Sequence, residues 1–322
     1  MPVLPPLLPL LQAMAGADAL LSADLPLAEK RELIHLGMAQ GGRFAEPMPD
    51  DVVCRDLEAP ADHPQPGVIR VRTYTPPGDA PVAGRPAHLF LHGGAWWLGT
   101  VEHFDAGCGN LAALADCVVV SVDYRLAPEH PYPVPLEDGI AAWLWLHEHA
   151  VALGVDPTRM SIGGGSAGGN LAAAACLALR DRGCPMPVAQ ALTVPATDLS
   201  LDYPSVAEYG AGYGLDASLV RQAVAFYLGD HGDPADPYVS PMRAATLAGL
   251  PPALVMTCEY DPGRDAAEAY ARRLAEAGIP TTLRRWDGFV HNAHIYTALL
   301  PEAREFRAVL VAFLREHHKT TA

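Results

Sequence analysis

The sequence predicts an α/β fold, with a mostly parallel central sheet covered by helices on both faces and a helical cap. From residue 87 to the end, short apolar runs alternate with longer segments of helical period. Residues 161–171, SIGGGSAGGNL, join one such run to an alanine-rich helix through a glycine-rich turn. Strands that alternate with helices form parallel sheets with both faces covered. Residues 1–45 and 198–238 break the alternation, and we expect them to fold over the carboxyl ends of the strands, where such sheets bind ligands.

The first third of the chain contains two helices and then strands. Residues 1–45 are expected to form two helices. The second of these has an apolar face formed by Leu33, Ile34, Leu36 and Met38. Alternation of apolar and polar residues indicates a strand at 68–74, which the Pro- and Gly-rich loop 76–86 ends. Apolar runs indicate buried strands at 87–91 and 117–122.

The rest of the chain alternates more regularly. Helical period or alanine content indicates helices at 136–149, 171–180, 217–228, 265–277 and 302–315. Short apolar runs indicate strands at 160–162, 188–194, 253–258 and 281–285. The expected organisation is N-terminal cap helices at 1–45, the first part of the core at 46–197, a cap insertion at 198–238 and the second part of the core at 239–322.

Length and composition indicate a well-packed protein with an acidic surface. The chain has 322 residues, of which 50% are hydrophobic and 18% are charged, so a large core is expected and disorder is not. The net charge of −15 argues against nucleic acid or an anionic membrane as a partner, because either would require a basic surface. No apolar run approaches the length of a membrane span.

The cysteines and the N-terminus favour a cytoplasmic location. The six cysteines form no C-x-x-C pair and are expected to be reduced and mostly buried. The first residues include a leucine-rich core, but no positive charge precedes it, and Pro5, Pro6 and Pro9 interrupt it. We therefore expect a short amphipathic helix around residues 7–15 and no signal peptide.

The glycine-rich turn is the strongest functional signal. Residues 164–168 fit the pattern G-x-S-x-G between a strand and a helix, which places Ser166 on a sharp, strained turn with its hydroxyl clear of the backbone. Small residues on both sides let the strand and the helix pass closely enough to form this turn. The N-terminus of the helix also presents free N–H groups and the positive end of the helix dipole, which stabilise an anion that forms beside Ser166. Ser166 is therefore the candidate nucleophile.

A serine nucleophile requires a base, and the base requires an acid that orients it. The strand at 253–258 leads into Asp261, and the strand at 281–285 leads into His291, so two neighbouring strand-end loops supply the acid and the histidine. The competing residues are the acids Glu259, Asp265 and Asp287 and the base His294. We expect Glu259 close to the strand, Asp265 capping a helix, Asp287 in a turn and His294 further along, in helix.

Residues 92–96, HGGAW, follow a buried strand and supply backbone N–H groups that could stabilise an oxyanion. A second donor is expected on the residue after the nucleophile, Ala167. Loss of one such donor typically lowers the rate about 100- to 1000-fold. The sequence leaves two locations open for Trp96 and Trp97, which are the wall of an apolar acyl pocket and the core.

Several of these motifs occur together in one known family. HGGAW (92–96), DYRLAPEHPYP (123–133), GGSAGGNLA (164–172), EYDPGRD (259–265) and the late histidine resemble the hormone-sensitive lipase family of carboxylesterases, bacterial family IV of the α/β-hydrolase superfamily. The resemblance runs from about residue 87 to the end, and the N-terminal helices fit the family's cap. It implies the α/β-hydrolase fold and a catalytic triad of Ser166, Asp261 and His291.

The resemblance also implies roles for other residues. The N–H groups of Gly94, Ala95 and Ala167 would form the oxyanion hole, with Gly93 shaping the turn. Loop-bracing roles would fall to His92, Asp123, Tyr124 and Glu129. The sequence departs from the family pattern at Ala95, where a third glycine is usual, at Gly165, often acidic, at Gly263, usually Leu, and at His291-Asn292-Ala293, commonly His-Gly-Phe.

These features predict a serine carboxylesterase that hydrolyses short- to medium-chain esters through an acyl-enzyme on Ser166. The expected partner is a small-molecule ester, without cofactor, metal, nucleic acid or membrane span, and the sequence leaves room for a homodimer. An alternative enzyme with the same site is an amidase, formamidase, deacetylase or dehydratase acting on a specialised metabolite. A non-catalytic receptor is a further alternative, since plant gibberellin receptors resemble this family, but they lack the histidine that is present here as His291.

Overall fold

A computed structural model describes residues 2–13, 25–62, 64–230 and 232–319 of this chain. It confirms the predicted fold class, because one eight-stranded sheet with the order β1-β2-β4-β3-β5-β6-β7-β8 forms the centre of the molecule. β2 runs antiparallel to both of its neighbours, and β3 to β8 are mutually parallel. The strands are β1 Val53–Ala61, β2 Gly67–Thr75, β3 Arg85–Leu91, β4 Val118–Asp123, β5 Val155–Gly165, β6 Gln190–Thr193, β7 Ala253–Tyr260 and β8 Thr281–Val290.

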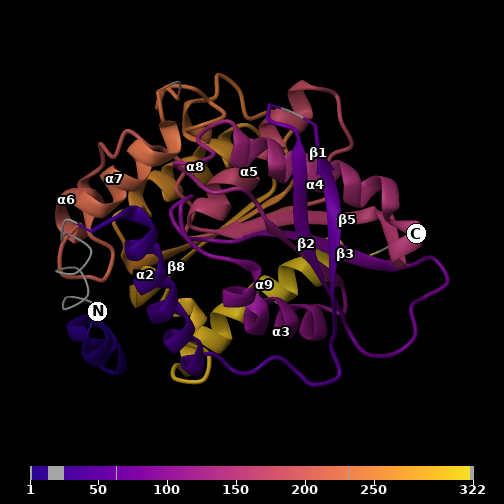
Figure 1. The fold of residues 1–322 in the computed structure, drawn as a ribbon, viewed down its shortest axis with the longest axis horizontal. Coiled ribbons are helices and arrows are strands. Elements are labelled where there is room, and N and C mark those ends of the chain that lie inside the picture. The colour runs from indigo at the N-terminus through magenta and orange to yellow at the C-terminus, as the bar shows by residue number, and fades with distance from the viewer. Residues whose placement is uncertain (1, 14–24, 63, 231, 320–322) are drawn as a thin grey trace.

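Helices cover both faces of the sheet, as expected when each parallel strand is followed by a crossover. The α-helices are α2 Leu27–Gly41, α3 Asp105–Ala115, α4 Val134–His149, α5 Ala167–Asp181, α6 Pro204–Tyr209, α7 Ala217–Leu228, α8 Arg264–Glu276 and α9 Pro301–His317. Side chains of α4, α5 and α8 pack into one large apolar cluster, and those of α3 and α9 pack into a second cluster on the other face. Figure 1 shows these two helical layers with the sheet between them.

The parallel strands are apolar because both of their faces are buried. In β4, VVVSVD, every residue except the terminal Asp123 is buried. α5 is rich in alanine, and all its residues from Ala167 to Leu179 are buried. Small side chains of this kind allow a helix to lie against the middle of a sheet.

Two elements, β1 and α3, were not predicted from the sequence. β1 lies at the edge of the sheet and is mostly exposed, so it lacks the apolar run of a buried strand. α3 contains two glycines, which weaken a helical pattern, and Gly109 lies where a side chain would collide with Met48. β5 is longer than the predicted 160–162, and β8 continues through Asp287 and Gly288, so the turn expected at Asp287 was wrong.

The N-terminal segment and the cysteines agree with their predicted character where they are described. Residues 8–13 are helical, and the rest of the helix predicted around 7–15 lies outside the described residues. All six cysteines are free thiols, and Cys108, Cys117, Cys176 and Cys258 are buried. None of the helices in the described ranges is long and apolar enough to cross a membrane.

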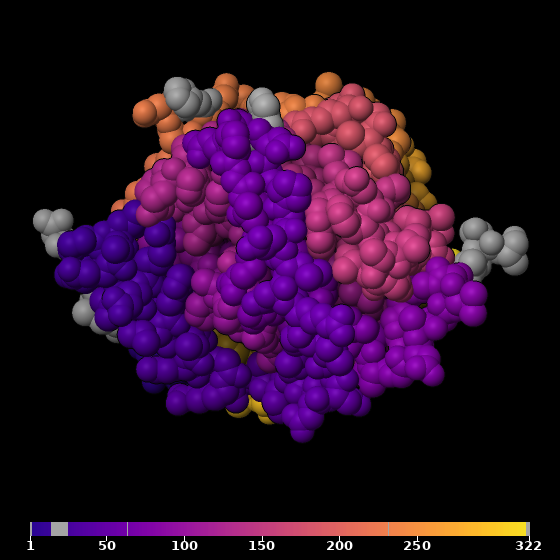
Figure 2. All heavy atoms as spheres, turned by 45° about the vertical axis from the view of Figure 1, so that its right-hand side comes forward, coloured from indigo at the N-terminus to yellow at the C-terminus, as the bar shows by residue number. Residues whose placement is uncertain are grey.

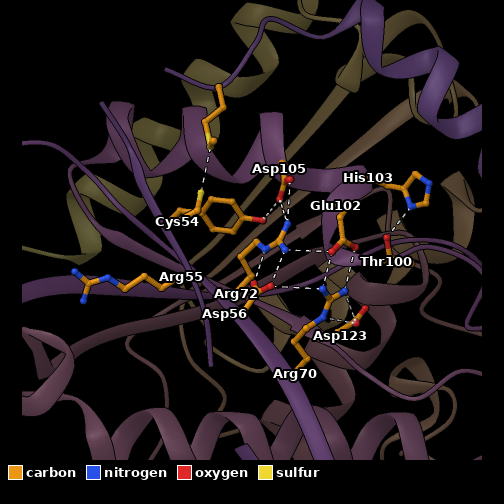
Figure 3. A network of polar contacts seen from close by, with 12 residues as sticks. Cys54, Arg55, Asp56, Arg70, Arg72, Thr100, Glu102, His103, Asp105 and Asp123 are labelled. Carbon is orange, nitrogen blue, oxygen red and sulfur yellow. Dashed lines mark hydrogen bonds and ion pairs between the residues drawn. The ribbon is translucent and has the colours of Figure 1, made fainter. Parts of the chain in front are cut away.

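A network of charges fastens β2 to the segment that follows the HGGAW turn (Figure 3). Arg70 binds Glu102 at 2.6 Å and Asp123 at 2.8 Å. Arg72 binds Asp56 at 2.6 Å, Asp105 at 3.0 Å and Glu102 at 3.1 Å. Glu102 lies in a 3₁₀ turn, Val101–Phe104, so this carboxylate ties the turn to two arginines of the sheet.

We predict that this network makes stability pH-dependent in acid. Hydrogen bonds from Arg70 lower the pKa of Glu102 to about 2. A carboxylate with a depressed pKa contributes stability that is fully present above its unfolded pKa, about 4.5, and is lost as the pH falls through about 2. Glu102→Gln should therefore lower the urea concentration at the midpoint of unfolding at pH 7. Between pH 4.5 and 2, this midpoint should fall less in the variant than in the wild type. An equal pH dependence in the variant and the wild type would contradict this role.

Candidate active site

Ser166 lies on a sharp turn between β5 and α5. Its backbone has φ 55° and ψ −117°, a conformation that costs a non-glycine residue about 1–3 kcal/mol and persists only where the surroundings enforce it. Here the surroundings are the end of β3, because a Cβ at Gly164 or Gly168 would overlap the carbonyl oxygen of Leu91. The two glycines therefore let α5 pass β3 closely enough to hold Ser166 in this turn.

The structure brings His291 and Asp261 to Ser166. Asp261 follows β7 directly and His291 follows β8, and these two neighbouring parallel strands end on the same side of the sheet. His291 Nε2 lies 3.0 Å from Ser166 Oγ, and His291 Nδ1 lies 2.7 Å from Asp261 Oδ2. The side chains of His291 and Asp261 are 7% and 2% exposed.

The second oxygen of Asp261 is also bonded. Asp261 Oδ1 accepts a hydrogen bond of 2.8 Å from the backbone N–H of Gly263. The carboxylate is thereby fixed in orientation, and it favours the imidazole tautomer with its proton on Nδ1. That tautomer leaves the Nε2 lone pair free to accept the Ser166 proton. The three side chains can act as nucleophile, base and orienting acid.

The rival residues from the sequence lie elsewhere. Glu259 accepts from the N–H of Gly288, Asp265 accepts from the N–H of Ser205, and Asp287 is exposed on β8. His294 is half-buried and stacks on Phe306, and desolvation lowers its pKa to about 3. Neither these three acids nor His294 forms a hydrogen bond with Ser166 or His291 in the described part of the chain.

A second serine–histidine contact occurs inside the sheet. Ser161 Oγ lies 2.8 Å from His318 Nε2 and 2.9 Å from His88 Nδ1. All three residues are at least 96% buried, and burial lowers the pKa of His88 to about 3 and that of His318 to about 4. Within the described ranges no carboxylate is bonded to either histidine, and Ser161 does not line the cavity that contains Ser166. This cluster packs the sheet against the end of α9.

The loop 92–99 after β3, here called the oxyanion turn, lies against the nucleophile turn. A Cβ on Gly93 would come within 3.6 Å of the Ser166 Cβ. Gly94, Ala95 and Trp96 have positive φ angles of 129°, 52° and 63°. In the described part of the chain, the N–H groups of Ala95 and Ala167 donate to no backbone oxygen. They are free to bind an oxyanion, and Ala95 reaches this conformation with backbone strain that a glycine would avoid.

The residues with implied bracing roles contact these loops. Tyr124 donates a hydrogen bond of 2.8 Å to the carbonyl of His92 and stacks on its ring, and His92 Nδ1 donates to the carbonyl of Gly93. Burial lowers the pKa of His92 to about 4, so the ring is neutral at pH 7. Asp123 binds Arg70, and Glu129 binds Arg31 of α2.

Asn170 was not predicted from the sequence to be functional, and its side chain links four segments. Its side-chain oxygen accepts from Trp96 Nε1 at 3.2 Å, and its amide group donates to the carbonyls of Ala196 and Val239. Asn170 is fully buried and lies one helical turn after Ser166. A polar residue in an otherwise alanine-rich buried helix was the signal that could have identified it.

A cavity of about 70 Å³ opens at Ser166, His291 and Asp261. Trp96 and Ala95 line one side of it. The segment 198–238 contributes Asp198 and six apolar side chains to the lining, which are Leu199, Leu201, Val206, Leu215, Ala217 and Val220. Trp97 lies outside this lining and packs edge-on against Phe226.

Three of the four departures from the family pattern have local explanations. A Cβ at Gly165 would come within 3.2 Å of Thr193 Oγ1, so a larger residue would require Thr193 to move. A Cβ at Gly263 would come within 3.3 Å of Asp261 Oδ1, the oxygen that accepts the Gly263 N–H. Asn292 has φ 64°, which suits asparagine and glycine. Nothing in the structure explains Ala95, whose φ favours glycine.

Comparison with known proteins gives consistent results. A family model described as the alpha/beta hydrolase fold matches residues 88–295. The carboxylic ester hydrolase LipN of Mycobacterium tuberculosis is 38% identical over 88% of this chain and 76% of its own length. The ethyl acetate hydrolase of Pseudomonas putida is 37% identical over 77% of this chain and 79% of its own.

Solved structures extend the similarity to the whole chain. The hyperthermophilic esterase of the archaeon Pyrobaculum calidifontis superposes with a TM-score of 0.88 at 35% identity, covering 98% of this chain and 99% of that one. An ester-hydrolase from the metagenome of Lake Arreo, solved with a bipyridine phosphonate derivative, gives a TM-score of 0.90 at 35% identity and covers 99% and 100%.

The geometry predicts the effect of removing the acid. Asp261→Asn should preserve the fold but lower kcat for an ester about 10⁴-fold, because an amide favours the wrong tautomer of His291. Asp287→Asn, at the exposed competing acid, is the control and should retain wild-type kcat. The measurement is steady-state hydrolysis of p-nitrophenyl acetate, with circular dichroism to check folding. Full activity of Asp261→Asn would show that Asp261 is not the orienting acid of the site.

Proposed function

This chain belongs to the α/β-hydrolase family, and we propose that it is a serine carboxylesterase with Ser166 as its nucleophile. The observation that carries the proposal is the pair of hydrogen bonds made by His291, to Ser166 Oγ at 3.0 Å and to Asp261 Oδ2 at 2.7 Å. The esterases among its relatives support ester hydrolysis as the reaction.

The proposed reaction proceeds in two steps. Ser166 Oγ attacks the acyl carbonyl while His291 Nε2 accepts its proton, and the ester C–O bond breaks as His291 returns that proton to the leaving alcohol. Water, deprotonated by His291, then attacks the acyl carbonyl, and the bond to Ser166 Oγ breaks as His291 returns the proton to that oxygen, which releases the carboxylic acid and restores the free enzyme. Asp261 stabilises the imidazolium in both steps, and the N–H groups of Gly94, Ala95 and Ala167 bind the oxyanion.

The cavity supports a preference for short acyl groups. Its volume of about 70 Å³ is about half of the roughly 150 Å³ that accommodates benzene in a protein core. We therefore place the preferred substrates at the short end of the short- to medium-chain range. The apolar lining from the insertion 198–238 suits an alkyl chain and offers few partners to a polar one.

The receptor alternative loses support from the same geometry. A binding protein requires no hydrogen-bonded serine, histidine and acid, whereas a hydrolase requires all three. Amide hydrolysis would use the same residues and is distinguished from ester hydrolysis by its substrate alone. We also propose the reducing cytoplasm as its location, which the six unpaired cysteines support.

The nucleophile is tested by Ser166→Ala. Ester turnover should fall about 10⁶-fold, as in other serine hydrolases that lose the nucleophile, with some rate above water left to the oxyanion donors. A serine-directed phosphonate should add one phosphonyl group to the wild type and none to the variant, as measured by intact mass. Fragmentation of the labelled peptide should place the group on Ser166 and leave Ser161 unmodified. Retention of most activity in Ser166→Ala would exclude covalent catalysis at this serine.

The acyl preference is tested with p-nitrophenyl esters from acetate to decanoate. We expect kcat/KM to be highest between acetate and butyrate and at least 10-fold lower at decanoate, because longer chains exceed the cavity. Leu215→Ala removes part of the lining and enlarges the cavity, so the variant should reach its highest kcat/KM with longer acyl chains. A parallel anilide assay separates esterase from amidase activity. A maximum at decanoate in the wild type would overturn the proposed preference.

A further inference from the structure

We infer that Arg31 and His35 of α2 are positioning residues that hold the oxyanion turn in its catalytic conformation. The inference rests on the proposed function, because it concerns how Ala95 presents its N–H to the oxyanion. Arg31 and His35 are four residues apart and therefore lie on the same side of α2. They bind two outward-facing backbone groups of the oxyanion turn, the carbonyl of Trp97 and the N–H of Gly99.

Arg31 joins the oxyanion turn to the loop that supports it. Its Nε donates to the carbonyl of Trp97 at 3.0 Å, and its Nη2 donates to the carbonyl of Ala127 at 3.0 Å. The N–H of Ala127 in turn donates to the carbonyl of Trp96. Both Nη atoms also donate to Glu129, at 2.9 and 2.8 Å, and this pairing with the guanidinium lowers the pKa of Glu129. The guanidinium group of Arg31 thus holds the backbone after Ala95 in two ways. It binds Trp97 directly, and it binds Ala127, whose N–H is bonded to Trp96.

His35 holds the other end of the turn. Its Nε2 accepts a hydrogen bond of 3.0 Å from the N–H of Gly99, and its own backbone carbonyl lies 3.3 Å from His103 Nε2. His103 Nδ1 lies 3.0 Å from the hydroxyl of Thr100, the residue next to Gly99 (Figure 3). α2 is therefore bonded to the turn at Trp97 and at Gly99, on both sides of Leu98.

Polar contacts matter here because α2 has little apolar anchorage. No residue of α2 is buried, and Leu33 and Leu36 are 44% and 54% exposed. Only Leu27 and Ile34 of this helix pack partly against the cluster of Trp97, Ala127 and Ala223. In Figure 1 the helix lies on the outside of the molecule, and Figure 2 shows the N-terminal atoms, in indigo, at one edge of the surface.

The turn requires such external bonds because its own conformation is strained. Ala95 and Trp96, at φ 52° and 63°, occupy a region that L-residues adopt only when neighbouring structure enforces it. Two backbone hydrogen bonds close the turn, from the N–H groups of Trp97 and Leu98 to the carbonyl of Gly94. They are the only ones between residues of the turn, all of which the structure describes. The bonds from α2 add constraints at Trp97 and Gly99, which follow Ala95 and Trp96 in the turn.

This arrangement predicts which kinetic constant changes. Neither Arg31 nor His35 lines the cavity at Ser166, so their loss should leave ground-state binding nearly unchanged. A displaced oxyanion donor acts in the transition state, so the loss should appear in kcat. A residue that served only stability would lower the melting temperature without this separation.

The first test compares Arg31→Gln with Lys30→Gln. Both substitutions remove one positive charge from α2. Between residues of the described ranges, Arg31 forms side-chain hydrogen bonds and Lys30 forms none. With p-nitrophenyl acetate we expect Arg31→Gln to lower kcat roughly 10- to 100-fold, less than full loss of an oxyanion donor, with KM changed less than about 2-fold. Lys30→Gln should retain wild-type values.

The second test uses His35 and does not depend on the folding of Arg31→Gln. His35→Leu removes the acceptor for Gly99 N–H, whereas His35→Gln keeps an acceptor oxygen at similar reach. We expect kcat to fall in His35→Leu and to recover at least partly in His35→Gln, at equal melting temperatures for the two variants.

The outcomes separate the two proposals. Wild-type turnover and phosphonate labelling at Ser166 are measured first, and failure of either overturns the proposed function and this inference with it. If both succeed and Arg31→Gln and His35→Leu keep wild-type kcat, the proposed function stands and the positioning role is wrong. The positioning role is also overturned if KM rises as much as kcat falls, or if His35→Gln and His35→Leu behave alike.

Discussion

The close passage of α5 across the end of β3 is the constraint on which the rest of the site depends. Gly164 and Gly168 have no room for a Cβ beside the carbonyl of Leu91, and this contact forces Ser166 into its strained backbone conformation. The same packing leaves the N–H of Ala167 free at the start of a helix that is buried as far as Leu179. The nucleophile and one oxyanion donor are thus set by a single contact between a helix and a strand.

The parallel sheet supplies the remaining groups by its order. β7 and β8 are neighbours and run in the same direction, so the residues that follow them, Asp261 and His291, meet at one edge. Since the carboxylate is bonded by both His291 and the N–H of Gly263, its orientation does not depend on a mobile loop. The sheet therefore positions the acid and the base with the rigidity of its own hydrogen bonds.

The oxyanion turn is supported differently, by side chains that come from outside the sheet. Tyr124 and His92 brace it from the core, and Asn170 fixes the Trp96 ring against α5. On its outer side, α2 contributes Arg31 and His35, and the arginines of β2 hold Glu102 in the segment that follows. These contacts satisfy backbone or side-chain groups near Ala95 and Trp96, the two non-glycine residues of the turn with positive φ. Their strained backbone persists only where neighbouring structure enforces it.

The sequence by itself determined the α/β fold class and identified Ser166, Asp261 and His291 as the residues to test. It could do so because a strained strand–turn–helix requires small residues at fixed spacing, and because apolar runs reveal buried parallel strands. It did not reveal β1, an exposed edge strand, or α3, whose glycines weaken the helical pattern. Contacts between segments distant in the sequence were decided only by tertiary structure. Ser161, a second serine bonded to a histidine, lies on β5 and contacts His88 of β3 and His318 at the end of α9. Arg31, 66 residues from Trp97, binds the carbonyl of Trp97. Neither local propensity nor spacing encodes such long-range hydrogen bonds, because they form only when packing brings the two segments together.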